Sequence, residues 1–158
     1  MFLGEYEHSI DDKHRLAIPA EIRDQLDQAH GGHDLVVAPG ANELLWLWPE
    51  STFQDLASAL GGSLVGDENM LDFERLFFSQ AARMSLDSAG RIRLPERLIS
   101  QYALSGSVMI LGVRDHLELC VPGDWRQQQK QLEQSHGQIW SMARKALAQR
   151  TDNSQGQD

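Results

Sequence analysis

The chain has 158 residues, of which 41% are hydrophobic and 23% are charged, and its formal net charge is −9. No apolar run approaches the ~18 residues of a membrane-spanning helix, and the N-terminus lacks the basic and apolar regions of a signal peptide, so we expect no membrane partner. The lone Cys120 excludes an internal disulfide and fits a reducing cytoplasm.

The charge is unevenly distributed along the chain. Residues 1–74 hold 3 basic and 15 acidic side chains, whereas residues 75–158 hold 11 basic and 8 acidic side chains. A surface that attracts phosphate needs only a local positive field, because charges are screened beyond roughly 10 Å at moderate salt. The overall acidity therefore weakens a nucleic-acid interpretation without excluding it.

The first predicted element is a hairpin turn in residues 10–19, Ile-Asp-Asp-Lys-His-Arg-Leu-Ala-Ile-Pro. Asp11 suits the first position of a type I turn, and His14 occupies the position that needs a left-handed backbone, which histidine tolerates at some cost. Pro19 suits the first position of a short helix over 20–26. Two buried strands are predicted next, at 34–38 and 44–48.

Two helices are predicted between the strands and the second half of the chain. Ser51 and Gln54 form a capping-box pattern for a helix that ends near Leu60. A second helix is expected from about 67 to 80, with apolar residues along one face. The glycines between the two helices mark a linker, at Gly61, Gly62 and Gly66.

The turn pattern recurs in residues 86–95, Leu-Asp-Ser-Ala-Gly-Arg-Ile-Arg-Leu-Pro. Asp87 again suits the start of a type I turn, and Gly90 suits the left-handed position. Pro95 is expected to start a helix over 96–102. Two further buried strands are predicted, at 107–111 and 117–121.

The C-terminal part of the sequence predicts one long helix and a tail. Asp124 is the expected cap of this helix, which extends to about residue 149 with Gly137 as a weak point. The polar segment 151–158 is expected to be disordered.

The two motifs indicate an internal duplication, since both follow the order apolar, Asp, three variable residues, Arg, apolar, any, apolar, Pro. We predict an α+β fold in which two pseudo-repeated β modules share one core, because neither half has enough strands to close a barrel by itself. The expected segments are a first repeat (1–50), linking helices (51–80), a second repeat (81–123), a C-terminal helix (124–150) and a disordered tail (151–158).

Alternation after each turn separates a buried face from an exposed face. Leu16, Ile18, Ile92 and Leu94 are expected to be buried. The outer face then carries Arg15, Ala17, Arg91 and Arg93.

The arginines at the two turns have two explanations. Arg15 and Arg91 can brace the hairpin by pairing with Asp11 and Asp87, or they can contact DNA. Both roles can coexist, because a guanidinium has five donors and can hold a carboxylate while it presents N–H groups to phosphate or guanine.

Other residue types give weaker signals. The six histidines do not complete a metal site: His30 and His33 lie close in sequence but have no further ligands at suitable spacing. Trp46 and Trp48 share one face of an apolar strand, which favours packing in the core or a subunit interface over base stacking. No nucleophile elbow or paired-carboxylate site is present, so we expect neither an enzyme nor a cofactor.

The motifs as a whole resemble the MraZ family over roughly residues 1 to 145. The resemblance is carried by the paired Asp-x-x-x-Arg motifs and by shorter matches. These are the Met1-Phe2-x-Gly4 start, the Ala81-Ala82-Arg83 segment before the second motif, and Leu117-Glu118-Leu119. His14 departs from the family pattern, which usually has Gly at this position.

The resemblance implies a tandem swapped-hairpin AbrB-like β-barrel with an internal pseudo-two-fold axis, assembled into a ring-shaped homo-oligomer. It also implies a cytoplasmic, nucleoid-associated regulator that binds double-stranded DNA at short promoter repeats ahead of division and cell-wall genes. Its DNA contacts come from the motif loops, and this places Lys13, Arg15, Arg91 and Arg93 at the DNA.

Two rival functions remain open. The chain could be an AbrB-type antitoxin whose C-terminal helix and tail hold a toxin. Alternatively, its acidity and His14 are consistent with an oligomeric scaffold that does not bind DNA.

Overall fold

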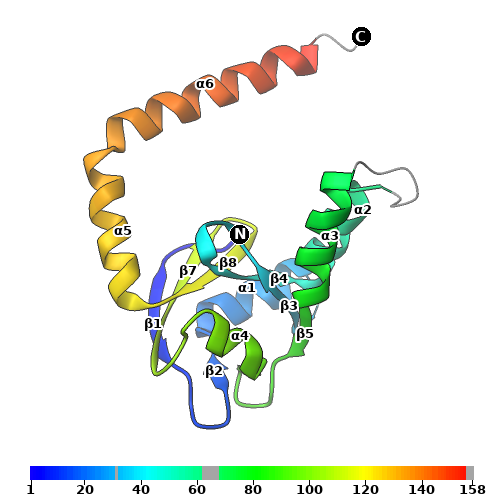
Figure 1. Ribbon diagram of the computed structural model, residues 1–158, viewed down its shortest axis with the longest axis vertical. Coiled ribbons are helices and arrows are strands. Elements are labelled where there is room, and N and C mark those ends of the chain that lie inside the picture. Colours follow the sequence, from blue (N-terminus) through cyan, green and yellow to red (C-terminus); the bar gives the residue numbers. More distant parts are fainter. Residues whose placement is uncertain (31, 62–67, 156–158) are drawn as a thin grey trace. The chain divides into compact units, whose positions relative to one another are not determined.

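In the computed structural model, residues 1–30, 32–61 and 68–155 are described (Figure 1). The chain forms two compact units, Met1–Pro122 and Gly123–Asp158. Both sequence repeats lie in the first unit, and the second unit is helical. None of the helices in the described ranges is long and apolar enough to cross a membrane.

Each repeat contributes four strands in the order that the sequence predicted. The strands of the first repeat are β1 (Glu5–Ser9), β2 (Arg15–Ala17), β3 (Asp34–Pro39) and β4 (Leu45–Pro49). Those of the second repeat are β5 (Ala82–Ser85), β6 (Arg91–Arg93), β7 (Ser107–Val113) and β8 (His116–Cys120).

The main sheet has six antiparallel strands in the order β1-β7-β8-β4-β3-β5. The order is unchanged when the two repeats are interchanged and the sheet is read from its other end. The first strand of each repeat pairs with the third strand of the other: β1 lies beside β7, and β5 lies beside β3. Each repeat therefore completes the sheet of its twin.

The expected closed barrel is not formed by the strands in the described ranges. The main sheet is open, with β1 and β5 at its edges, and β2 and β6 form a separate two-stranded sheet. A single bridge, between Ile10 and Leu16, joins the β1 side to β2. The ladder does not close because β2 and β6 pair with each other instead of extending the edges of the main sheet.

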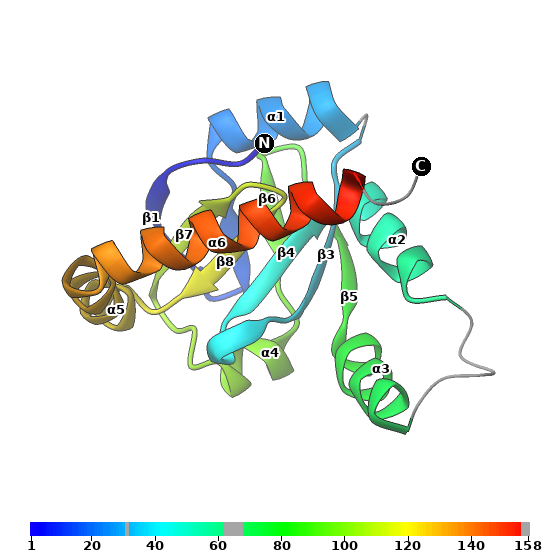
Figure 2. The same cartoon turned by 90° about the horizontal axis from the view of Figure 1, so that it is seen from above.

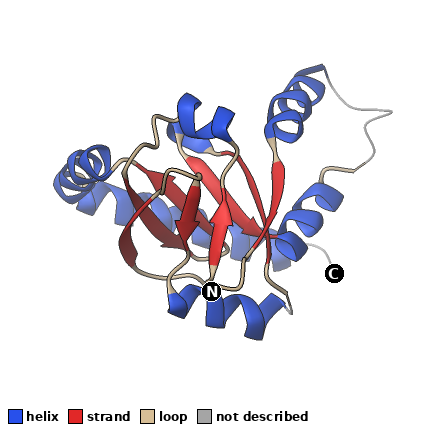
Figure 3. Cartoon of the chain, turned by 90° about the horizontal axis from the view of Figure 1, so that it is seen from below, coloured by secondary structure: helices blue, strands red, loops and turns tan. Residues whose placement is uncertain are grey.

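The two repeats share one hydrophobic core, as predicted. Its fully buried residues come from both copies and include Leu16, Leu47, Ile92 and Ile110. Two helices at equivalent places in the repeats, α1 (Ala20–His30) and α4 (Glu96–Gln101), lie on opposite sides of the strands (Figure 2, Figure 3). Their buried side chains join the same core: Ile22 and Leu26 from α1, and Leu98 from α4.

The helices between the repeats are α2 (Glu50–Ala59) and α3 (Glu68–Gln80). They contact β3 and β4 and enclose a second, smaller aromatic core around Trp48 and Phe77. The predicted capping box is wrong: α2 is capped by Pro49 without a side-chain hydrogen bond. Gly62 and Gly66 of the predicted linker lie outside the described residues.

The C-terminal unit consists of α5 (Pro122–Gln134) and α6 (His136–Gln155), which meet at a sharp bend (Figure 1). The prediction of one continuous helix is therefore wrong, and the break falls two residues before Gly137. Of the predicted tail, residues 151–155 continue α6, and residues 156–158 lie outside the described residues.

Candidate nucleic-acid interface

The two Asp-x-x-x-Arg turns have the same construction. The Asp11 Oδ1 atom accepts hydrogen bonds from the backbone N–H groups of Lys13 and Arg15, both at 2.9 Å. In the second turn, Asp87 Oδ1 accepts the N–H groups of Ala89 and Arg91, at 2.9 and 3.0 Å. The aspartate at the first position thus satisfies two backbone donors that the turn would otherwise leave unpaired.

The fourth position of each turn is left-handed. The backbone φ angle is 60° at His14 and 72° at Gly90. Histidine accepts this conformation less readily than glycine, so the first turn is the more strained of the two.

Both motif arginines are held by their own aspartates. Arg15 Nε donates to Asp11 Oδ2 at 2.8 Å, and Arg91 donates to Asp87 Oδ2 from Nε at 2.9 Å and from Nη2 at 2.8 Å. The arginine side chains remain 30% and 33% exposed. The bracing contact is therefore present, and part of each guanidinium is still accessible from solvent.

These contacts lower the pKa values of the two turn carboxyls. The backbone N–H of Arg15 makes the largest contribution to holding the pKa of Asp11 below its ordinary value, with help from the Arg15 side chain. At the second turn, the Arg91 guanidinium is the main cause of the lowered pKa of Asp87. Both aspartates are therefore ionised at neutral pH and cancel part of the positive charge of their arginines.

Strands β2 and β6 form a ribbon with an internal pseudo-two-fold axis. Leu16 pairs with Ile92 at its centre, and the flanking pairs are Arg15 with Arg93 and Ala17 with Arg91. The symmetry extends to backbone hydrogen bonds beyond the strands: Ile18 N–H donates to the Gly90 carbonyl at 3.0 Å, and Leu94 N–H donates to the His14 carbonyl at 2.9 Å.

The outer face of the β2–β6 ribbon is cationic. Directly paired residues share a face, so Arg15, Arg91 and Arg93 lie together, opposite the buried Leu16 and Ile92. Arg93 is exposed, and so is Lys13 in the first turn. Among the described residues, neither of these two side chains has an ion-pair partner, so their charges are not neutralised locally.

Sequence reasoning missed one cation at this interface, Arg23 of α1. Its Nε donates to the Ile18 carbonyl at 3.2 Å, and a Cβ atom added to Gly90 would lie 2.7 Å from its Nη1. Arg23 therefore reaches from the first repeat onto the turn of the second. The sequence gives little sign of this contact. Arg23 stands between Glu21 and Asp24, and such a mixture of charges is typical of a solvent-exposed helix face.

The other candidate groups lie elsewhere. His33 pairs with Asp27 at 3.1 Å, and the described ranges contain no group of three or more potential metal ligands. Trp48 is buried in the second aromatic core and Trp46 packs against it, as predicted for core packing. His116, which is 8% exposed, stacks on the Trp46 ring with centroids 4.1 Å apart.

The fold and the ribbon define a class: a tandem-repeat α+β protein whose repeats exchange strands and whose pseudo-two-fold axis passes through an arginine-bearing β-ribbon. Comparison with known proteins identifies the family. The family described as "MraZ protein, putative antitoxin-like" matches residues 1–73 and 77–146. The chain belongs to the MraZ family.

Curated relatives support this assignment. A protein of Roseiflexus sp. (strain RS-1) is 40% identical over 126 residues, covering 80% of this chain and 85% of the relative. One from Thermomicrobium roseum is 35% identical over 132 residues (84% and 89%), and one from Syntrophomonas wolfei is 32% identical over 139 residues (88% and 94%). All three are named transcriptional regulator MraZ.

Proposed function

We propose that this chain regulates transcription by binding specific sites on double-stranded DNA through the outer face of the β2–β6 ribbon. The observation that carries the proposal is the clustering of three guanidiniums on one face of a pseudo-symmetric ribbon. A two-stranded ribbon fits the major groove of B-DNA, where arginine can bind guanine with two hydrogen bonds. The names of the relatives agree with this function.

Each cation has a distinct proposed role. Arg15 and Arg91 are oriented by Asp11 and Asp87, which leave guanidinium N–H groups free for a base edge or a phosphate. Arg93 and Lys13 lack such partners among the described residues and suit phosphate contacts, which position a protein on the duplex without reading its sequence.

The finer architecture is part of the proposal. The strand exchange between repeats supports a swapped-hairpin arrangement of the AbrB type, and the chain is proposed to self-associate into a ring. A ring presents several ribbons to one duplex, so weak individual contacts combine through effective concentration. The proposed targets are promoter repeats of division and cell-wall genes, and the proposed location is the nucleoid in the cytoplasm.

The proposal is tested by fluorescence anisotropy with a duplex from the upstream region of the chain's own gene and with a shuffled duplex of equal length. We expect preference for the native sequence and a steep loss of affinity with added salt. Equal affinity for both duplexes would refute sequence-specific regulation. Absence of binding at low salt would instead support a scaffold.

Alanine substitutions separate the bracing role of the arginines from the DNA role. Arg91→Ala is expected to weaken specific binding while sedimentation and circular dichroism remain unchanged. Arg114→Ala is the matched control, because Arg114 also pairs with an aspartate, Asp115 at 3.2 Å, but lies between β7 and β8. Loss of assembly or of folded structure in Arg91→Ala would show that the contact with Asp87 is mainly structural.

A second candidate function is that of an antitoxin, which the description of the matching family favours. In this case the exposed C-terminal helices would hold a small toxin. Isolation of the tagged chain from its native host tests this, and a stoichiometric small partner that binds α6 would support it.

A further inference from the structure

The α2–α3 region carries an apolar pocket of about 360 Å³. We call it the α2–α3 pocket. Its walls include Trp46 and Trp48 of β4, Leu56 of α2, and Phe73 and Leu76 of α3. Leu56 and Phe73 are exposed, and Leu76 is 58% exposed. Large apolar side chains grouped around a concavity are typical of a binding surface rather than of ordinary solvated surface.

Acidic residues are frequent in the segments that line the α2–α3 pocket. Glu43, Asp55 and Asp72 are exposed and stand within two residues of pocket-lining positions. The sequence from 43 to 75 contains seven acidic residues and one basic residue, Arg75, which pairs with Asp72 at 2.9 Å. The surface is therefore suited to an apolar partner with basic flanks.

Helix α6 is basic and carries exposed apolar side chains, so it is complementary in charge to the α2–α3 region. Ile139, Trp140 and Leu147 are spaced to share one side of the helix, and all three are exposed, Trp140 by 56%. The segment 134–151 contains three Lys or Arg residues and no Asp or Glu. α6 is thus a basic helix with exposed apolar side chains, within its own compact unit.

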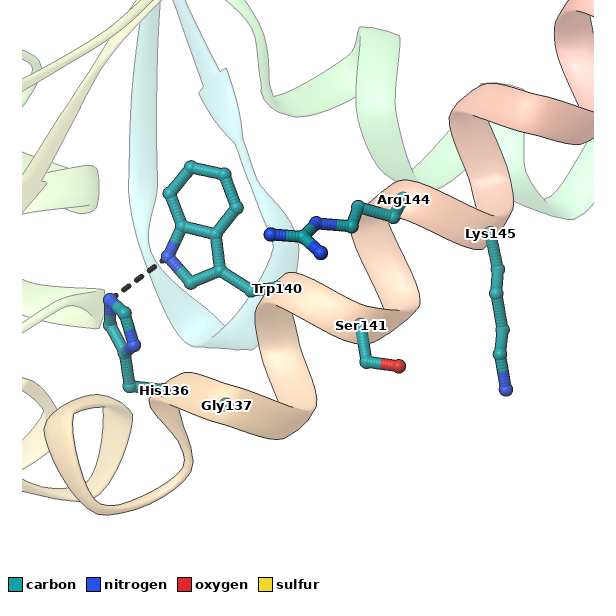
Figure 4. A pocket seen from close by; sticks show the side chains of 6 residues that line it. All are labelled: His136, Gly137, Trp140, Ser141, Arg144 and Lys145. Carbon is teal, nitrogen blue, oxygen red and sulfur yellow. Dashed lines mark hydrogen bonds between the residues drawn. The ribbon is translucent and has the colours of Figure 1, made fainter.

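Figure 4 shows how the side chains of α6 are arranged around a shallow pocket on the helix surface. The Trp140 indole N–H donates to His136 Nε2 at 2.9 Å, which fixes the ring across the preceding turn. Arg144 extends toward the same side as Trp140, whereas Lys145 points away (Figure 4). A guanidinium therefore flanks the aromatic ring.

We propose that α6 of one copy binds in the α2–α3 pocket of a second copy, with Trp140 as the buried anchor and Arg144 facing the acidic residues that neighbour the pocket, Glu43 and Asp55. Aromatic residues that fill a pocket dominate interface energetics, and the opposite charges of the two surfaces fix their orientation. The inference rests on the self-association proposed above, and it identifies the surfaces involved.

The two surfaces are different and both belong to the same chain. Their contact is therefore heterologous, and repeated head-to-tail contacts generate a ring when the rotation closes. In such an assembly each copy contributes one helix and one pocket, so all pockets are filled only when the ring is complete.

Disulfide trapping tests the proposed contact directly. Full-length Trp140→Cys and Leu76→Cys chains, carrying tags of different size, are co-expressed and oxidised; the native Cys120 is buried. We expect a mixed dimer on a non-reducing gel. Ser141→Cys replaces Trp140→Cys in the control, because Ser141 lies about 100° further around the helix. A yield no higher than this control overturns the proposal, as does a disulfide that forms only when both substitutions are in one chain.

Sedimentation without DNA separates this inference from the rest of the proposed function. Trp140→Ala should weaken self-association about thirtyfold, as expected for a central anchor. Arg144→Glu should also weaken it, and Lys145→Glu should have little effect. A monomeric wild-type chain refutes self-association and docking together. An assembled wild type without the mixed disulfide refutes the docking alone, and so does a Trp140→Ala variant that loses DNA affinity but sediments normally.

Discussion

Arg93 offers the clearest measurement of how the ribbon meets DNA. It stands opposite Arg15 on the outer face of the ribbon, and no ion pair restrains it among the described residues. Replacing it with alanine therefore removes one positive charge without leaving a carboxylate unpaired. The pseudo-two-fold axis relates this position to Ala17, so Ala17→Arg is the converse substitution: it adds a fourth guanidinium to the face.

The size of the effect follows from the number of phosphates contacted. The logarithm of affinity falls with the logarithm of salt concentration with a slope of about −0.9 for each neutralised phosphate. Loss of one contact should lower affinity about eightfold at 0.1 M salt and about fourfold at 0.2 M, if 1 M is the concentration at which this contribution vanishes. If several ribbons bind one duplex, the change in slope is multiplied by their number.

The assay is a salt titration of anisotropy with one specific duplex and one shuffled duplex. We expect Arg93→Ala to flatten the slope for both duplexes and Ala17→Arg to steepen it, because a phosphate contact carries no sequence information. Arg114→Ala serves as the control for removal of one arginine from another surface. Unchanged slopes in both ribbon variants, with the folded structure intact, would show that this face does not meet the duplex.

Three further predictions concern stability and are measured by urea unfolding. Leu16→Ala leaves a cavity at a fully buried position on the pseudo-two-fold axis and should lower the free energy of unfolding by about 2–5 kcal/mol. Gly40→Ala should lower the free energy of unfolding by about 1–3 kcal/mol, because the added Cβ would lie 2.2 Å from the Trp46 ring. In the control Gly123→Ala the added Cβ meets no atom within 4 Å, so this loss should be absent. Burial lowers the pKa of His116, but hydrogen bonds and charges from Glu118 and Asp115 outweigh it and raise the pKa above its ordinary value of 6.5. The protonated side chain therefore stabilises the fold fully below pH 6.5, and this contribution is lost as the pH rises through the folded-state pKa; His116→Gln should remove this part of the pH dependence.

Features that depend on local sequence were predicted well. The two turns and the buried faces of the strands that follow them were visible because turn chemistry and period-two alternation act over only a few residues. The positive φ at His14 was expected for the same reason. The sequence also predicted a shared core, since each half was too small to bury its own apolar strands.

Features that depend on contacts between distant parts of the chain were harder to predict from the sequence. The capping-box pattern at Ser51 was overridden because α2 follows directly on β4. Its cap is Pro49, two residues before the expected cap. The position of Arg23 over Gly90 could not be inferred, because it requires α1 of one repeat to lie against the turn of the other. A repeat in the sequence indicates that two copies exist, but it does not determine which strands they exchange.

The differences between the copies matter more for function than their similarity. At equivalent places on the ribbon the second repeat has Gly90 and Arg93, whereas the first has His14 and Ala17. Arg23 of the first repeat also lies over the second turn, and this adds to the asymmetry. The fold is therefore close to two-fold symmetric while the positive charge is not, and the second repeat is expected to carry the larger share of DNA affinity. A duplex site that matches such a ribbon need not be a perfect palindrome, because its two halves meet unequal sets of donors.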